Sequence, residues 1–224
     1  GPINAYLLTS NNRIIGVDLD QPQFALSVIA ALQGSAVNTT GALDPGEEIL
    51  DIDFRNAEGT IYALTRTGTV GRVIIINPAS GQITRVSTLV ADAADNVGNP
   101  TAYSGLAASG VSYTIDFNPA VDRLRVFGSN GSNLRIDALT GETFTDGDVN
   151  GAAGASITGT AYRDTFAAGG AGRGTALFSI DAVTDSIYAT AANAGTLSAP
   201  KLLGVGDVAT VNGYDINPEN NAGV

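Results

Sequence analysis

Short runs of alternating apolar and polar residues follow one another along most of the chain. Residues 60–65 (TIYALT) and 123–128 (RLRVFG) are typical of these runs. A period of two favours antiparallel strands. The runs end at turn-forming residues, such as Asn-Pro at 118–119 and Ser-Asn-Gly at 129–131. The pattern therefore predicts an all-β chain of many short strands, and 28 glycines among 224 residues agree with many turns.

The strands repeat in units of four. Each unit has a strand ending in Asp-Phe or Asp-Ile, a strand after a polar turn, a strand ending in Ile-Asp or Ile-Asn, and a short fourth strand. Full units cover residues 48–89, 112–146 and 156–205. The first unit, 5–32, lacks its opening strand, and VNGYDIN at 211–217 opens a fifth. Four strands in a period of ~40–50 residues are typical of propeller blades.

We therefore predict that residues 1–224 form one β-propeller-like domain of four four-stranded antiparallel blades, or of five blades in a longer parent protein. Residues 211–217 are expected to supply the opening strand that unit 5–32 lacks. Closure within one chain gives a compact ring, whereas closure between chains gives larger rings or filaments. Both alternatives stay open at this point. The candidate assembly residues are Asn212, Tyr214 and Ile216.

Composition removes several classes of function. The chain has no Cys, His, Met or Trp. Disulfides, thiolate or imidazole metal ligands and the Ser-His-Asp and Cys-His mechanisms are therefore excluded, and we do not expect an enzyme. The net charge of −11 argues against nucleic acid and against an acidic membrane surface as partners. Because no apolar run approaches 18 residues, we expect no membrane insertion.

The stretch DGDVNG (146–151) resembles the start of a calcium-binding loop. Asp146, Asp148 and Asn150 offer oxygens at alternating positions, and Gly151 suits the sharp turn. The Glu expected eleven residues after the first Asp is replaced by Ile157, so the motif is incomplete. The alternatives are a calcium site and a plain polar turn; we expect no other cofactor.

Three arginines form a second candidate site. Arg123 and Arg125 share one face of a predicted strand, and Arg135 belongs to the next strand. A guanidinium fork suits a carboxylate or another anion, so these residues are a candidate ligand site. The competing interpretation is an internal network of ion pairs with nearby aspartates. If the domain binds a ligand, such as a glycan, we expect loops 33–47 and 90–110 to shape the site.

Three stretches resemble a known family. They are AYLLTSNNRIIGVD (5–18), DIDFRNAEGTIYAL (51–64) and the block IDFNPAVDRLRV…NLRIDALTG (115–141). They are similar to a bacterial family defined only as a domain of unknown function, whose members are propeller-like and mostly carried on secreted or surface-anchored proteins. The resemblance implies this fold and an extracellular or cell-surface location, and it supplies no activity. Members continue with further strands where this chain ends at Val224, and the chain has no initiator Met, so we expect a processed or trimmed product.

The sequence thus predicts a non-enzymatic extracellular structural or adhesive protein. We expect it to self-assemble by strand exchange into filaments or a surface or matrix layer, with copies of itself as partners. The alternative is a monomeric propeller that binds a ligand or carbohydrate.

Overall fold

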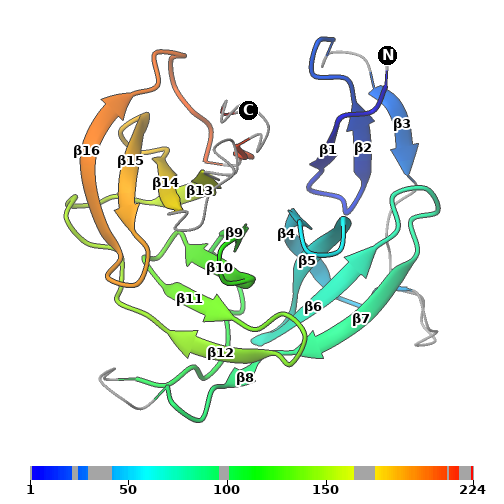
Figure 1. Ribbon diagram of the computed structural model, residues 1–224, viewed down its shortest axis with the longest axis horizontal. Coiled ribbons are helices and arrows are strands. Elements are labelled where there is room, and N and C mark those ends of the chain that lie inside the picture. Colours follow the sequence, from blue (N-terminus) through cyan, green and yellow to red (C-terminus); the bar gives the residue numbers. More distant parts are fainter. Residues whose placement is uncertain are drawn as a thin grey trace.

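The protein is an open ring of antiparallel sheets. The computed structural model describes residues 2–21, 25–29, 42–95, 101–163, 175–210, 212–216 and 223. Within these residues there are four sheets and no helix, and hence no helix long and apolar enough to span a membrane. The sheets surround a common centre, and the first and fourth sheets lie on either side of the opening (Figure 1). The predicted all-β, propeller-like fold is confirmed.

The strands follow the order of the repeat. The first sheet contains β1 (Ala5–Leu8), β2 (Ile14–Val17) and β3 (Ala25–Ile29). The second contains β4 (Glu48–Arg55), β5 (Thr60–Thr67), β6 (Val70–Ile76) and β7 (Ile83–Thr88). The third contains β8 (Val90–Ala91), β9 (Tyr113–Asn118), β10 (Arg123–Gly128), β11 (Asn133–Ile136) and β12 (Glu142–Thr145). The fourth contains β13 (Ile157–Arg163), β14 (Ala176–Asp181), β15 (Ser186–Ala191) and β16 (Thr196–Leu202).

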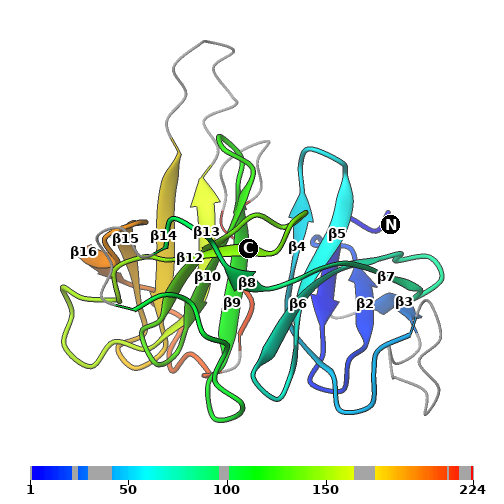
Figure 2. The same cartoon turned by 90° about the horizontal axis from the view of Figure 1, so that it is seen from below.

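Three strands line the centre of the ring, and we call β4, β9 and β13 the inner strands. Each is the first strand of its unit and an edge of its sheet. β4 contacts β9 and β9 contacts β13, and Figure 2 shows β4 and β9 facing each other near the middle of the molecule. In the part of the chain that the structure describes, the first sheet has no such strand, and β1 pairs with β2 alone.

The hydrophobic core lies between neighbouring sheets rather than inside any one of them. Along β5, Tyr62 and Leu64 pack toward the third sheet, whereas Ile61 and Ala63 pack toward the first. This alternation follows from the period of two, and it explains why β5 is apolar on both faces. Burial of one such side chain contributes roughly 1.5–3 kcal/mol. The same packing joins the third and fourth sheets through Phe127 and its neighbours.

One connection differs from the prediction. Residues 90–110 were expected to form a loop, but Val90 and Ala91 form β8, which pairs in parallel with Glu142 and Thr143 of β12. The backbones of Thr88 and Gly141 approach so closely here that a Cβ on Gly141 would lie 2.0 Å from the carbonyl oxygen of Thr88. The second unit is thereby fastened to the outer edge of the third sheet.

The C-terminal segment, Asn212–Ile216, lies beside β13. We call it the tail. Asn212 Nδ2 donates to Thr158 Oγ1 at 2.7 Å, and Gly159 leaves room for Tyr214, whose Cβ would lie 2.9 Å from a Cβ at that glycine. The expected ladder between residues 211–217 and the first sheet is not among the strand pairings of the described residues. There, Ile216 forms a single bridge with Gly223.

Candidate functional site

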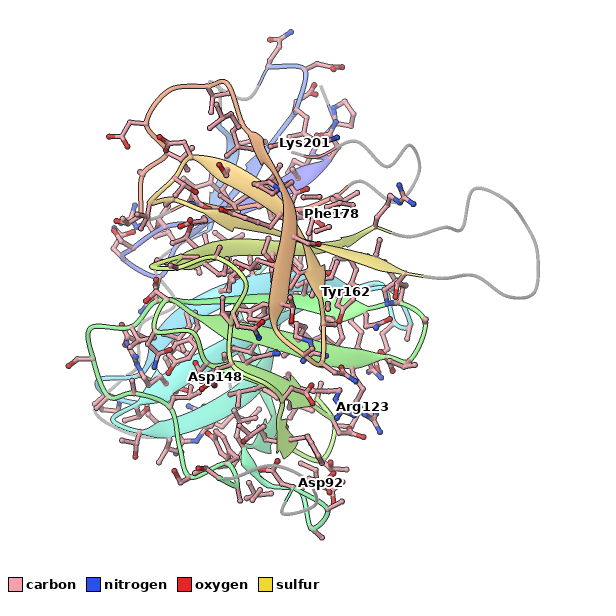
Figure 3. All side chains as sticks on the ribbon, turned by 90° about the vertical axis from the view of Figure 1, so that its left-hand side faces the viewer. Asp92, Arg123, Asp148, Tyr162, Phe178 and Lys201 are labelled. Carbon is pink, nitrogen blue, oxygen red and sulfur yellow. The ribbon has the colours of Figure 1, made fainter. Side chains whose placement is uncertain are left out.

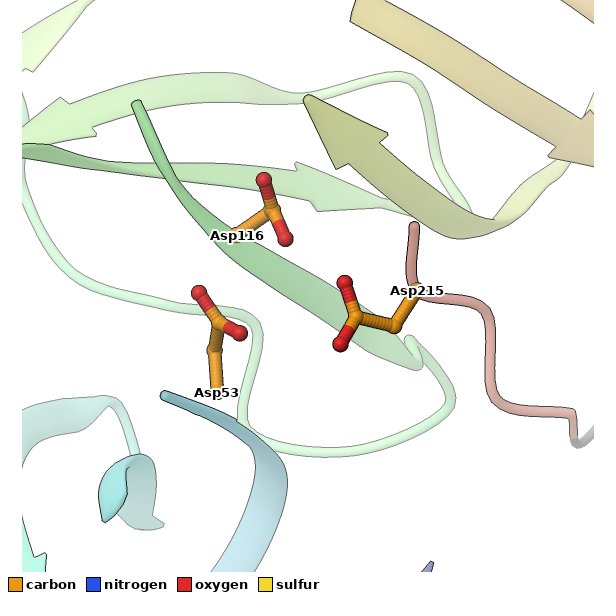
Figure 4. Close-up of side chains that lie close together, drawn as sticks. All are labelled: Asp53, Asp116 and Asp215. Atoms are coloured by element: carbon orange, nitrogen blue, oxygen red, sulfur yellow. The ribbon is translucent and has the colours of Figure 1, made fainter. Parts of the chain in front are cut away.

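Three carboxylates meet at the centre of the ring. Asp53 comes from β4, Asp116 from β9 and Asp215 from the tail, and one oxygen of each lies within 4.8 Å of the others. Figure 4 shows the three side chains pointing toward one another. Asp116 is buried, Asp53 is half-buried and Asp215 is exposed. Each is the Asp of an Asp-Phe or Asp-Ile pair, so the repeat itself places them together.

Alternation along the inner strands puts a second polar residue on the same side. Two residues before Asp53 stands Asp51, and two residues before Asp116 stands Thr114. Asp51 Oδ2 accepts a hydrogen bond from the backbone N–H of Ile115 at 2.8 Å. β4 therefore presents two acceptors, Asp51 and Asp53, to the backbone of β9.

The inner strands are joined by side-chain acceptors. Asp53 Oδ2 accepts from the N–H of Phe117 on β9 at 2.6 Å, and Asp116 Oδ2 accepts from the N–H of Tyr162 on β13 at 2.7 Å. Thr114 Oγ1 accepts from Thr160 N at 3.2 Å in the same way. We call this series, in which a side chain of one inner strand binds the backbone of the next, the side-chain relay.

Burial makes the cluster costly to ionise. It raises the pKa of Asp51 to about 6, and it raises the pKa of Asp53 and Asp116 well above the usual range, with further repulsion from neighbouring carboxylates. The carboxyl group of Asp215 faces the same cluster, and burial raises its pKa too. Burial first, and then the charges of Asp215 and Asp116, raise the pKa of Tyr214 to about 12.

Within the described residues, these carboxylates have no ion-pair partner. None of the ion pairs found among the described residues includes Asp51, Asp53, Asp116 or Asp215. Carboxylates this close share protons at low pH. The three carboxylate oxygens are also close enough together for one calcium ion to lie ~2.4 Å from each of them. Calcium takes about six to eight oxygens, however, so three carboxylates alone would not complete such a site. The relay is the better-defined feature, because each of its bonds has a donor and an acceptor in the structure.

The structure gives the three predicted arginines internal partners. Arg125 is buried, and its guanidinium donates to Asn133 at 2.8 Å, Asp146 at 2.6 Å and Asn193 at 2.8 Å. Arg135 meets the same Asp146 at 3.1 Å. These contacts match the ion-pair interpretation, because they engage both terminal nitrogens of the Arg125 guanidinium with partners inside the protein. Arg123 lies apart, at the surface in Figure 3, and pairs with Asp137 at 2.9 Å.

The candidate calcium ligands Asp146 and Asn150 have partners within the protein, which favours the polar-turn alternative. Both oxygens of Asp146 are bound by arginine side chains, one by Arg125 and Arg135 and the other by Arg135. Asn150 Nδ2 donates to the carbonyl of Asp148, and Asn150 Oδ1 accepts from Thr196 at 2.8 Å. Asp146 is buried, whereas Asp148, two residues further along, is exposed.

Parts of the two predicted ligand loops lie outside the described residues, namely 33–41 and 96–100. The described part of loop 90–110 is fastened inward, because Asp95 Oδ1 accepts from the N–H of Thr145 at 2.6 Å. The predicted assembly residues Asn212, Tyr214 and Ile216 lie in the tail beside β13, and Ile216 is buried.

Comparison with known proteins adds a family. A family model described as "Domain of unknown function (DUF4394)" matches residues 24–224. The chain belongs to the DUF4394 family. This confirms the expected membership of a family of unknown function. A search of curated proteins finds no match for this DUF4394 chain.

Solved structures resemble the DUF4394 chain at low sequence identity. One is the C-terminal WD40 domain of Sif2, at 13% identity and a TM-score of 0.41, covering 71% of this chain and 38% of that one. Another is an auxiliary nutrient binding protein from Bacteroides thetaiotaomicron, at 12% identity and a TM-score of 0.47, covering 97% of this chain and 55% of that one. The chain therefore spans less than two thirds of either structure. The fold assignment rests on the arrangement of the sheets.

Sequence reasoning missed the central cluster of this DUF4394 domain. The repeated Asp near the end of the first strand was recognised only as part of the repeat and was given no functional role. Because first strands line the centre of a propeller, an acid repeated at that position, as in Asp53, Asp116 and Asp215, was the available signal.

Proposed function

We propose that this DUF4394 domain is an extracellular structural module that self-assembles by strand completion. The observation that carries the proposal is the open edge of the first sheet. The second, third and fourth sheets each begin with an inner strand, whereas β1 has a partner on one side only in the described residues. The strand that completes this sheet comes, in our proposal, from the tail of another copy. The family resemblance of the sequence supports the extracellular location.

The edge of β1 offers unpaired backbone groups. Thr9 N donates to Arg13 O, and the register places Leu7 opposite Ile15. In an antiparallel pair the residues between such bonded positions direct their N–H and C=O away from the partner strand. The backbone N–H and C=O groups of Tyr6 and Leu8 therefore face the open edge, while the side chains of both residues pack against the core. Such an edge is a template for a further strand.

The edge strands β1 and β16 differ in how well they resist pairing with a further strand. β16, the outer edge of the fourth sheet, carries Pro200 and Lys201 and a register shift against β15, all of which hinder edge-to-edge pairing. Figure 3 shows Lys201 on this strand. β1 consists of Ala-Tyr-Leu-Leu and has neither a charge nor a proline, and Leu7 is 48% exposed. β1 therefore lacks the proline and the charge that protect β16, and its edge is accessible to a further strand.

A concentration series tests the proposal. We expect the purified protein to form species above 22.6 kDa in light scattering, and rings or filaments in negative-stain electron microscopy, as concentration rises. Leu7→Lys places a charge on the edge strand and should shift assembly to higher concentration. Val183→Lys makes the same change at an exposed hydrophobic residue in the turn between β14 and β15, and should assemble like the parent. A parent that remains a monomer at every concentration refutes the proposal.

A further inference from the structure

The tail is held to the ring by few contacts. Asn212 Nδ2 donates to Thr158 Oγ1 of β13, and Tyr214 packs where Gly159 has no side chain. Ile216 is buried, but its single bridge is not to a strand of the ring. Asn212 Oδ1 is buried without a hydrogen-bond partner in the described residues, which costs free energy. Side chains rather than a ladder of backbone bonds therefore hold the tail there, so a modest change in energy decides whether it stays docked.

Docking brings the carboxyl group of the tail against carboxyl groups of the ring. One oxygen each of Asp215, Asp53 on β4 and Asp116 on β9 lie within 4.8 Å of one another, and Figure 4 shows the tail approaching these two inner strands. The charge of Asp215 also acts on Asp51 of β4 and on its own neighbour Tyr214. The titratable groups around Asp215 on β4, on β9 and in the tail are thus all acids.

β13, on which the tail packs, adds no compensating positive charge. Its two titratable residues are Tyr162, whose ring lies in the core between the third and fourth sheets, and Arg163, which is exposed at the end of the strand. Neither residue takes part in the ion pairs found among the described residues. Like charges in one partly buried site oppose one another's ionisation, and salt screens them only weakly.

This arrangement fixes the direction in which pH acts on docking. Burial raises the pKa of Asp53 and of Asp116 well above the usual range, and the charge of Asp215 adds to the shift in both. Each group whose pKa is higher with the tail docked takes up protons on docking. Docking is therefore favoured in acid, and that advantage is lost as pH rises through the pKa of the docked state.

We propose that the tail is a proton-controlled latch, in which Asp215 stays docked in acid by sharing protons with Asp53 and Asp116 and is released from the ring when these groups ionise. Asp215 is exposed, so protons reach the cluster from solvent. The inference goes beyond the proposed function and does not rest on it, because it concerns the tail of a single copy.

A dye on the tail measures docking. The chain has no cysteine, so Gly213→Cys provides a single labelling site. Gly213 is exposed, and a Cβ there meets nothing within 4 Å. The fluorescence anisotropy of a pH-insensitive dye at this position should be high near pH 4 and low at pH 8, because a released tail reorients faster. We expect the ratio of docked to free tail to fall about tenfold or more, the change that one proton gives when its pKa differs by one unit.

The conditions keep other effects out of this measurement. The labelled protein is kept dilute enough for light scattering to show the monomer, so that assembly plays no part in the result. EDTA is present throughout, so that no divalent cation takes the place of the protons. Circular dichroism at each pH confirms that the sheets stay folded.

Variants of the labelled protein identify the groups that act. Asp215→Asn keeps an acceptor for the N–H of Ile216 but cannot ionise, so its anisotropy should stay high at pH 8. Thr158→Val removes the partner of Asn212 and should lower the anisotropy at every pH, which shows that the dye reports docking. Asp207→Asn, at an exposed acid before the tail, should follow the parent. Parent anisotropy that is constant from pH 4 to 8, or an Asp215→Asn protein that falls with pH as the parent does, would overturn the proposal.

Discussion

Replacing Asp51 by Asn should remove the pH dependence that this side chain gives to the stability of the domain, so that the variant compares better with the parent at neutral pH than in acid. Burial raises the pKa of Asp51 to about 6 from an ordinary value near 3.8. The folded state therefore holds this proton more tightly than the unfolded state does. The resulting stability is fully present below pH 3.8 and is lost as pH rises through 6. At about 1.36 kcal/mol for each pH unit, the parent gives up about 3 kcal/mol by pH 7.

Asn cannot ionise, so its effect on stability is the same at every pH, and this effect includes the loss of one of the two backbone hydrogen bonds that Asp51 accepts. The matched measurement is urea unfolding of the parent and of Asp51→Asn between pH 4 and 8, with the exposed Asp207→Asn as control. A change of about 3 kcal/mol corresponds to about 1 M of urea, so the midpoint of Asp51→Asn relative to that of the parent should rise by close to 1 M between pH 4 and pH 7. Equal midpoint differences at pH 4 and pH 7 would mean that Asp51 is not held against its charge in the folded state.

Other predictions concern stability and assembly. Arg125→Ala leaves Asp146 buried with fewer partners and should cost about 3–5 kcal/mol, whereas Arg123→Ala, at an exposed pair, should cost less than about 1 kcal/mol in chemical unfolding. Gly141→Ala places a Cβ 2.0 Å from Thr88 O and should lower the melting temperature far more than Gly154→Ala, where a Cβ meets nothing within 4 Å at a similar positive φ. Equal losses for the two glycines would contradict the close approach at β8. Leu7→Lys should reduce assembly relative to Val183→Lys, as the concentration series measures.

The sequence was sufficient for the fold class because strand alternation and turn chemistry are local. Runs such as 60–65 and 123–128 lie in β5 and β10. β8 escaped prediction, since two exposed residues that pair in parallel leave no periodic signal. The spacing of DGDVNG suggested a cation site, but spacing does not say which way a carboxylate points, and Asp146 points toward Arg125 and Arg135.

The central cluster could not be derived from spacing alone. Asp53, Asp116 and Asp215 are far apart in the sequence, and their meeting depends on how sharply successive sheets turn around the centre. That turn is set by packing of one sheet on the next, through residues such as Tyr62 and Phe117, whose rings meet edge to face at 5.4 Å. Packing of this kind is a tertiary property. The sequence repeat shows where each Asp lies within its unit, but the contact among the three carboxylates follows only from the ring arrangement of the sheets.

The side-chain relay has a consequence for how such a protein changes over evolution. Neighbouring inner strands are joined by one or two side-chain acceptors, and each acceptor needs from the next strand only a backbone N–H at a fixed place, which any residue except proline supplies. When a unit is duplicated or deleted, the relay therefore adds no sequence requirement to the apolar packing that neighbouring sheets already share. The number of units is then free to drift between relatives, while the Asp that ends the first strand of a unit is the element that a new copy must keep to hold its successor.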